Sequence, residues 1–406
     1  MRDTTILRRL LALPEIRVVG AELGAAGLIV DVRLGRTRLR CPACPFATRR
    51  VYDRRPERRW RHLDLGGWRC YLRMPLRRLR CPRHGVRTEG VPFAAAHAGH
   101  TLAFEELVAW QAQRLDKTSI TRLMRISWRS VGRILERWMA RAERPDLSGL
   151  RRIGVDEKSW RKGHRYVTVV FDHDRRRVAF MTEGGGEESL GRFFAALGQT
   201  GAAAIELVTM DMSRNYLRAV QRRAPQAEVC FDPFHVVTLA NFALDQVRRE
   251  EWNRARRAGT DPRAVKHTRW ALLKHPARLS AAQRTLLGAI RRGNARLWRA
   301  YELKEMVRAI YAGAGVEDAR AWLDGFIHRA RRSRLRQFAK LADLYRDHRE
   351  GILAAVRHGL SNARLEGLNN RLALLNHRSA GFHSAEAFMA LAMLCVGGYT
   401  PALPFH

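Results

Sequence analysis

Residues 151–232 decide the fold, and they begin with RRIGVDE at 151–157. Three short apolar runs typical of strands follow one another, and afterwards strand-like and amphipathic segments alternate. We expect strands at 151–156, 164–172, 176–183, 203–211 and 227–232, and helices at 187–199, at 213–223 and from 233 onward. The expected order is therefore three strands, a helix, a strand, a helix, a strand and a helix.

That order has a consequence for two acidic residues at strand ends. Three consecutive strands followed by strand–helix units form the mixed sheet of a ribonuclease H-like fold, in which the first and fourth strands are neighbours. Asp156 and Asp211 would then converge. Two close carboxylates repel unless cations neutralise them, and oxygen ligands suit Mg²⁺. A single strand-end acid is more often a solvated surface residue, so it is the pair that favours a site for two-metal phosphoryl transfer.

A third carboxylate would complete such a site, and periodicity leaves three candidates open. Asp232 and Asp245 follow the fifth expected strand, whereas Glu366 lies in SNARLEGLNNRL at 361–372. The leucines there recur at three and four residues, which marks one helix face for the core. The polar face of that helix carries Asn362, Glu366, Asn370 and His377. A glutamate in this position is usually solvated, but Gly367 beside it would let a backbone, a phosphate or a DNA strand approach.

The N-terminal part contains two short-spaced pairs of metal-ligating residues. They read Cys41-Pro-Ala-Cys44 and Cys81-Pro-Arg-His84. Two such pairs bring four ligands to one tetrahedral ion, as in structural zinc sites. Incidental reduced thiols in a small core are the alternative interpretation.

A hairpin is expected to join these two pairs. Residues 58–80 read as two strands around Gly66-Gly67, which predicts a strand-rich module similar to a zinc ribbon. Cys70 and His62 lie in or beside the turn-proximal part of this hairpin and are alternative ligands, although neither has a second ligand at the short spacing.

A helix-turn-helix is expected at 118–138, where the sequence reads TSITRLMRISWRSVGRILERW. We expect Thr118 to cap a short first helix whose apolar residues are Ile120, Leu123 and Met124. Ser127 is a good N-cap for the second helix. The inward residues of that helix are Val131, Ile134, Leu135 and Trp138. Its outer face presents Arg129, Ser130 and Arg133, as a recognition helix does in the major groove of DNA, although any small helical hairpin shows a similar pattern.

The composition points to a polyanionic partner. Lys and Arg total 75 against 39 Asp and Glu, a formal net charge of +36. A GC-rich coding bias explains Arg in place of Lys but not the excess over acids, so nucleic acid is the simplest partner. We find no signal-peptide pattern and no apolar run long enough to span a membrane, which favours a cytosolic protein whose six cysteines stay reduced.

Four blocks together resemble the bacterial insertion-sequence transposases of the DDE class, specifically the "ISL-three" family. The blocks are IGVDE at 153–157, MDMS at 210–213, FDPFHVV at 231–237 with N-x-x-LD after it, and SNARLEGLNNRL with a downstream GF. The resemblance extends over nearly the whole chain, and its blocks are specific in combination and weak singly.

The resemblance implies which residues form the sites. By position, the metal-binding triad of the family falls on Asp156, Asp211 and Glu366, and its zinc ligands fall on Cys41, Cys44 and Cys81. The family has a fourth cysteine where this chain has His84, which is also an acceptable zinc ligand. A supporting role near the site is implied for Asp232 and His235, and Asn362 and Asn370 would orient Glu366 or touch phosphate.

The resemblance also implies the activity and the partners. The enzyme would bind terminal inverted repeats in double-stranded DNA, cleave a strand to free a 3′-hydroxyl, and direct that hydroxyl to target DNA. Two Mg²⁺ or Mn²⁺ ions would serve this chemistry, and a structural Zn²⁺ would serve the N-terminal module. A homodimer on DNA and a place in the bacterial cytoplasm with the nucleoid are expected by analogy. The alternatives are a catalytically dead DNA-binding regulator and a ribonuclease H-like nuclease without strand transfer.

The expected architecture is multidomain α+β. We expect a strand-rich zinc-binding module at 1–97, the helix-turn-helix at 98–148, the first part of the catalytic core at 149–235, a basic α-helical insertion at 236–357, and the final core helices at 358–406. The tryptophans of the insertion either pack between helices, which is commoner, or clamp DNA. They are Trp252, Trp270, Trp298 and Trp322.

Overall fold

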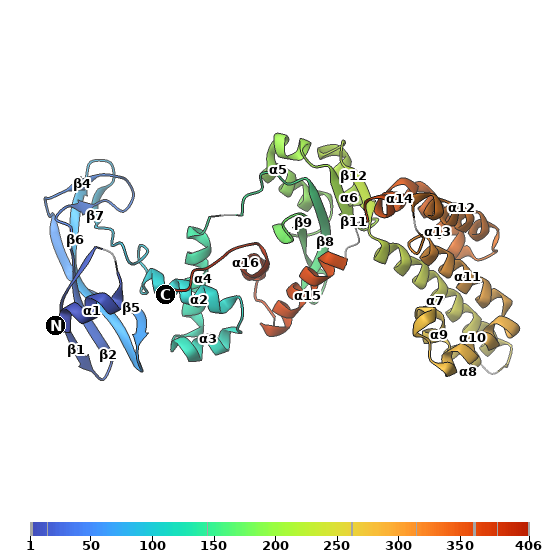
Figure 1. Cartoon of the computed structure of the whole chain (residues 1–406), viewed down its shortest axis with the longest axis horizontal. Coiled ribbons are helices and arrows are strands. Elements are labelled where there is room, and N and C mark those ends of the chain that lie inside the picture. Colours follow the sequence, from blue (N-terminus) through green and yellow to red (C-terminus); the bar gives the residue numbers. More distant parts are fainter. Residues whose placement is uncertain are drawn as a thin grey trace. The chain divides into compact units, whose positions relative to one another are not determined.

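The computed structural model describes residues 3–13, 15–143, 145–260, 263–313, 315–359, 363–379 and 381–404. It divides into two compact units, Met1–Glu143 with Tyr399–His406 and Arg144–Gly398, and we describe each by itself (Figure 1). Within the described residues, no helix combines the length and the apolar character that crossing a membrane requires.

The first unit begins with a β module. Its elements are α1 (Asp3–Leu11), β1 (Ile16–Gly24), β2 (Gly27–Leu34), β3 (Leu39–Arg40), β4 (Ala47–Thr48), β5 (Asp53–Leu65), β6 (Trp68–Cys81) and β7 (Gly85–Thr88). The main sheet has the order β1-β2-β6-β5, and β7 pairs with β6. The expected hairpin around Gly66 is confirmed, because β5 and β6 pair in antiparallel fashion. Gly27 permits the parallel β2–β6 pairing, since it has a φ of +120° and a Cβ there would lie 2.3 Å from the Arg69 carbonyl oxygen.

Three helices follow in the same unit: α2 (Leu102–Ala112), α3 (Lys117–Met124) and α4 (Trp128–Arg141). The N-cap prediction for Ser127 is confirmed, because its hydroxyl accepts from the Ser130 N–H at 3.1 Å. The prediction for Thr118 is wrong. Asp116 caps α3 instead, and a carboxylate at the N-terminus also gains from the helix dipole. Leu123 is exposed rather than inward, so the buried stripe of α3 consists of Ile120 and Met124.

The second unit contains a five-stranded sheet. Its elements in chain order are β8 (Arg152–Arg161), β9 (Arg165–Asp172), β10 (Arg177–Glu183), α5 (Glu187–Ala203), β11 (Leu207–Met210), α6 (Arg214–Arg223), β12 (Glu228–Phe231) and α7 (Pro233–Arg257). This is the order that the sequence predicted. The strands lie in the order β10-β9-β8-β11-β12, with β8, β11 and β12 parallel to one another.

Helices cover both faces of this sheet. The helices α5 and α6 share a core with one face, through residues such as Val155 on β8 and Phe193 on α5. The other face packs against α15 (Ala363–Arg378) and α16 (Ala385–Val396). The leucine stripe is confirmed for Leu368, Leu372 and Leu375, which are buried in that second core.

A helical region follows the sheet. It comprises α7 and then α8 (Arg263–Lys266), α9 (Arg269–Leu273), η1 (Pro276–Arg278), α10 (Ala281–Gly293), α11 (Ala295–Ala309), α12 (Val316–Arg332), α13 (Arg336–Asp347) and α14 (Arg349–His358). Core packing is confirmed for Trp298, which packs on the main core. It is wrong for Trp270 and Trp322, whose side chains are exposed.

Candidate active site and metal cluster

Three acidic residues, which we call the acidic edge, lie in a row across three neighbouring strands: Asp211 and Asp232 directly follow β11 and β12, and Asp156 lies within β8. The expected end of the first strand at Asp156 is wrong, because β8 stays paired with β9 as far as Arg161. The strand β11 pairs in parallel with β8 on one side and with β12 on the other. When the register of both pairs is continued past the last paired residues, Asp211 lies opposite Asp156 on one side and Asp232 on the other. The strand pairing therefore brings Asp156 and Asp211 together, as the expected strand order required.

Asp211 is a largely buried carboxyl group whose pKa is raised, chiefly by burial. Burial and the charge of Asp156 raise the pKa of Asp211, and the Ser213 N–H and nearby His235 lower it only in part. The Ser213 N–H donates to Oδ1 of Asp211 at 3.0 Å. A carboxyl group with a raised pKa beside a second carboxylate is an arrangement that a bound cation would stabilise.

Asp156 is held by groups from its own strand and from a distant helix. Its Oδ1 accepts from the Glu157 N–H at 2.8 Å. Its Oδ2 lies 3.1 Å from the Lys158 ammonium and accepts from Nδ2 of Asn369, on α15, at 2.8 Å. The C-terminal helix is thus joined directly to the first strand of the sheet, although the two are separated by more than 200 residues.

This contact places the helix that carries Glu366 next to the acidic edge. The side chain of Glu366 and the whole of Asn362 lie outside the described residues. Asn370 is exposed, and the contact with Asp156 is made by its neighbour Asn369, which sequence reasoning did not single out. The sequence does contain a clue to Asn369. It follows Glu366 by three residues, so its side chain lies about one helical turn from Glu366, on a neighbouring face of the helix.

The other acidic candidates differ in their surroundings. Asp232 is buried and caps α7, where its Oδ1 accepts from the Phe234 N–H at 3.3 Å. His235 lies on the same turn, with Nε2 3.7 Å from Oδ2 of Asp232. Asp245 is also buried, but it is paired with Arg248 at 2.8 Å and with a second arginine, so its charge is already met within α7.

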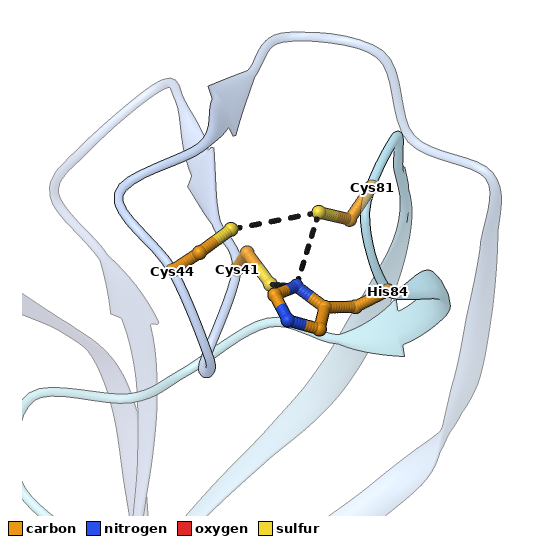
Figure 2. Close-up of side chains that lie close together, drawn as sticks. All are labelled: Cys41, Cys44, Cys81 and His84. Carbon is orange, nitrogen blue, oxygen red and sulfur yellow. Dashed lines mark hydrogen bonds between the residues drawn. The ribbon is translucent and has the colours of Figure 1, made fainter.

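In the β module, four side chains form a cluster that suits a metal ion. The ligand atoms of Cys41, Cys44, Cys81 and His84 all lie within 4.8 Å of one another (Figure 2). Cys44 Sγ is 3.6 Å from Cys81 Sγ, and His84 Nδ1 is 3.7 Å from Cys41 Sγ and 3.5 Å from Cys81 Sγ. A tetrahedral zinc ion with Zn–S bonds of about 2.3 Å requires S···S separations of about 3.8 Å. The predicted Cys3His grouping is therefore present at the spacing of such an ion.

The alternative ligands in the hairpin lie outside this cluster. Cys70 is buried, and burial raises the pKa of its thiol to about 11. His62 is buried too, and its Nδ1 is 2.9 Å from the Thr101 hydroxyl. In contrast, backbone N–H groups of Arg83 and His84 lower the pKa of the Cys81 thiol to about 6 against the effect of burial. A thiol that ionises readily is a better metal ligand.

The helices α2 to α4 place the expected DNA-contacting residues at the start of α4. Arg129 and Arg133 are exposed, as expected. Ser130 is half-buried, and its hydroxyl lies 2.9 Å from that of Ser127. The buried Glu105 on α2 accepts from Arg137 at 2.8 Å and from a further arginine of α4 at 2.6 Å, which fixes α4 against α2.

Comparison with known proteins agrees with these features. A transposase model of the DDE class and ISL3 family matches residues 153–392, the helix-turn-helix domain of transposase family ISL3 matches 89–139, and the zinc-finger of transposase IS204/IS1001/IS1096/IS1165 matches 37–84. The chain is 42% identical over 370 residues to the transposase for insertion sequence element IS1557 of Mycobacterium tuberculosis, which covers 86% of this chain and 83% of the relative. It is 28% identical to the transposase for insertion sequence element IS1001 of Bordetella parapertussis, over 86% of each chain. The chain therefore belongs to the DDE-type insertion-sequence transposases of the ISL3 family.

Proposed function

We propose that this transposase uses Asp156, Asp211 and Glu366 as its catalytic acids. One observation carries the proposal: Asp156 and Asp211 lie on adjacent parallel strands, and the helix bearing Glu366 is joined to Asp156 through Asn369. Glu366 precedes Asn369 by three residues, so it belongs to the same part of α15. Asp232 and His235 lie at the same edge and have a supporting role, whereas the arginine pairing of Asp245 argues against a role at the site.

The strand order supports a ribonuclease H-like catalytic core. In this proposal the core consists of residues 149–235 and 358–406, and residues 236–357 are a helical insertion between its parts. Residues 1–97 form the zinc-binding module, and residues 98–148 carry the helix-turn-helix. The insertion contacts the sheet at β12, where Gly351 of α14 leaves room for Phe231: a Cβ at that glycine would lie 2.5 Å from the ring.

The residues at the acidic edge fit divalent metal ions. Carboxylate oxygens are the hard donors that Mg²⁺ and Mn²⁺ prefer, and the pKa of Asp211 is raised by burial and, to a smaller extent, by the charge of Asp156. Asp156, Asp211 and Glu366 would hold two such ions. When bound, the ions activate the attacking oxygen and stabilise the leaving oxygen of a phosphoryl transfer.

The chain's own residues position this chemistry. The Glu157 N–H and Asn369 Nδ2 each donate to one oxygen of Asp156, so both oxygens are oriented from the protein side. Lys158 supplies a positive charge 3.1 Å from the same carboxylate, where a phosphate of the DNA would also be attracted. The reaction would be cleavage at the ends of an insertion sequence and transfer of the 3′-hydroxyl to target DNA.

The Cys3His cluster would hold a structural Zn²⁺. Its ligand separations of 3.5–3.7 Å match the edges of a zinc-centred tetrahedron, and four protein ligands leave no open position for catalysis. Such an ion would join β6 and β7 to the Cys41–Cys44 loop and so stiffen the module.

Double-stranded DNA is the proposed partner of the first unit. Arg129 and Arg133 on α4 would contact the major groove, and Ser130 would help to orient the start of the helix, because its hydroxyl is near that of Ser127. A homodimer on DNA follows from the need to join two ends, and the proposed location is the bacterial cytoplasm with the nucleoid.

The test is cleavage of DNA that carries the insertion-sequence ends, in Mg²⁺ or Mn²⁺. Asp211→Ala and Glu366→Ala should each abolish cleavage, while Glu188→Ala, which removes an exposed acid on α5, should not. Unchanged cleavage in either triad variant would overturn the assignment. Joined end–target products identify strand transfer, whereas cleaved ends alone would point to a nuclease.

A further inference from the structure

A pocket opens beside the acidic edge, between β8 and the two C-terminal helices. It has a volume of about 910 Å³, within the range of sites that hold small organic groups. Its walls are the end of β8 with the turn after it, one face of α15, and the segment that leads into α16. Lys158 lies both in this lining and beside Asp156, whereas the turn after β8 and the segment before α16 take no part in the site described above.

Among the described residues, the ionisable side chains that line this pocket are all basic. Its lining includes Lys158, Arg161, Lys162, His377 and His383, and none of the described residues that line it is acidic. Of these cations, Lys158 already lies 3.1 Å from Asp156, a carboxylate that does not line the pocket. A polyanion is the complementary ligand.

The strand β8 connects the pocket to the proposed catalytic acids. Successive side chains of a strand point to opposite faces, so Asp156, Lys158 and Trp160 lie on the same face. Trp160 belongs to the core shared with α15 and α16, which identifies that face. The pocket therefore begins about 7 Å along the strand from Asp156, at about 3.3 Å per residue.

Two buried polar atoms in the pocket wall have no hydrogen-bond partner in the described part of the chain. They are Nε1 of Trp160, whose side chain is 3% exposed, and Oδ1 of Asn376. Nδ2 of Asn376 donates to the Ser159 carbonyl oxygen at 3.2 Å, which fixes the amide. A buried donor or acceptor without a hydrogen-bond partner destabilises the folded state, and a ligand that forms the missing bond removes this penalty.

We propose that this pocket binds a DNA strand that continues from the phosphodiester held at Asp156. Arg161 and Lys162 contact its phosphates, and the Trp160 N–H and the Asn376 carbonyl oxygen, which neighbouring side chains cover in this structure, bond to a nucleotide after a side-chain rearrangement. The pocket's aromatic wall, which includes Phe382, suits a base. The proposal rests on the proposed catalytic site, because the path of the DNA strand is defined as running from a phosphodiester at Asp156 into the pocket.

The strand comes from one of two sources, the flank of the insertion-sequence end or the target, and the experiment separates them. Full-length protein is titrated, without divalent ions, with three probes: a blunt end duplex, an end duplex with a single-stranded flank, and a gapped target duplex. Arg161→Ala/Lys162→Ala removes two single-strand phosphate contacts. The slope of log K against log salt should fall by about 1.4, and affinity at 0.1 M salt by about 25-fold.

The control removes the same charge from the other side of the sheet. Arg222→Ala/Arg223→Ala changes two exposed residues at the end of α6 and should leave all three slopes unchanged. Trp160→Phe keeps an aromatic side chain but removes the N–H together with the five-membered ring, so it should weaken the same probe 2- to 10-fold, with circular dichroism to show that the core stays folded.

A slope change confined to the flanked end assigns the pocket to the end strand, and one confined to the gapped target assigns it to the target strand. Unchanged slopes with all three probes in Arg161→Ala/Lys162→Ala would overturn the proposal. Because binding is measured without metal, this outcome is independent of whether Asp211→Ala and Glu366→Ala abolish cleavage.

Discussion

The hydrogen bond from Asn369 to Asp156 gives a quantitative test of how α15 serves the acidic edge. Asn369→Ala removes a 2.8 Å bond to a carboxylate. A hydrogen bond to a charged group contributes about 1.5–3 kcal/mol, and the lower part of that range applies because 19% of the Asp156 side chain is exposed. Since about 1.4 kcal/mol is a factor of ten in rate, we expect cleavage to slow by about 10- to 30-fold.

A second substitution distinguishes an electrostatic contact from simple packing. Asn369→Asp keeps the size of the side chain but replaces the N–H donor with an oxygen facing Oδ2 of Asp156. Like charges at that separation repel by an amount on the order of 6 kcal/mol at an effective dielectric constant of 20. We therefore expect the aspartate variant to be less active than the alanine variant. A packing role would reverse this order, because aspartate fills the space that alanine leaves empty.

The assay is single-turnover cleavage of labelled end DNA at saturating Mg²⁺, with circular dichroism to show that the fold is retained. Asn253→Ala is the matched control, because it removes the same side chain from an exposed position on α7, away from the acidic edge. Cleavage by Asn369→Ala within twofold of the unmodified enzyme, or full activity in Asn369→Asp, would refute the reasoning.

Three further predictions concern the first unit. Cys44→Ala should reduce bound zinc from one equivalent to almost none, measured by metal analysis of the purified protein. Glu105→Gln should destabilise the helix-turn-helix by about 3 kcal/mol in urea unfolding followed by tryptophan fluorescence, because it leaves Arg137 beside a neutral group. Burial and the charge of Arg61 lower the pKa of His62 from 6.5 to about 4, so between these values only the unfolded chain takes up the proton. The free energy of unfolding should therefore fall by about 3 kcal/mol as the pH drops from 6.5 to 4. The His62→Gln variant should lack this part of the pH dependence.

Much of the fold was predictable because its signals are local. Strands and helices of the second unit follow from apolar periodicity, and their order determines which strands are neighbours. Cys41, Cys44, Cys81 and His84 were predictable for the same reason, since each pair sits on one short loop and the hairpin between them has a glycine turn.

What could not be predicted depends on tertiary packing. A helical wheel separates the two faces of α15, but it does not show that the helix crosses β8 so that Asn369 meets Asp156. Similarly, Leu123 fits the inward stripe of α3, yet that position faces solvent because α3 is short and packs through Ile120. The ion pair between Lys158 and Asp156 could not be predicted either. It depends on which face of β8 is covered by helices, and the sequence does not show that.

The two faces of β8 explain why this strand is suited to carry Asp156, the proposed catalytic acid. Glu157 points away from the acidic edge, and its Oε1 accepts from the hydroxyl of Tyr216, on α6, at 2.7 Å. The Tyr216 hydroxyl also lies 2.9 Å from that of Thr168, on β9, which in turn is 2.7 Å from the Ser189 hydroxyl of α5. These bonds tie β8 to its neighbours from behind, while Asp156 and Lys158 project from the front. A strand fixed on one face in this way resists displacement when charge changes on the other, so in the proposed mechanism cations and DNA would bind beside Asp156 without shifting its strand.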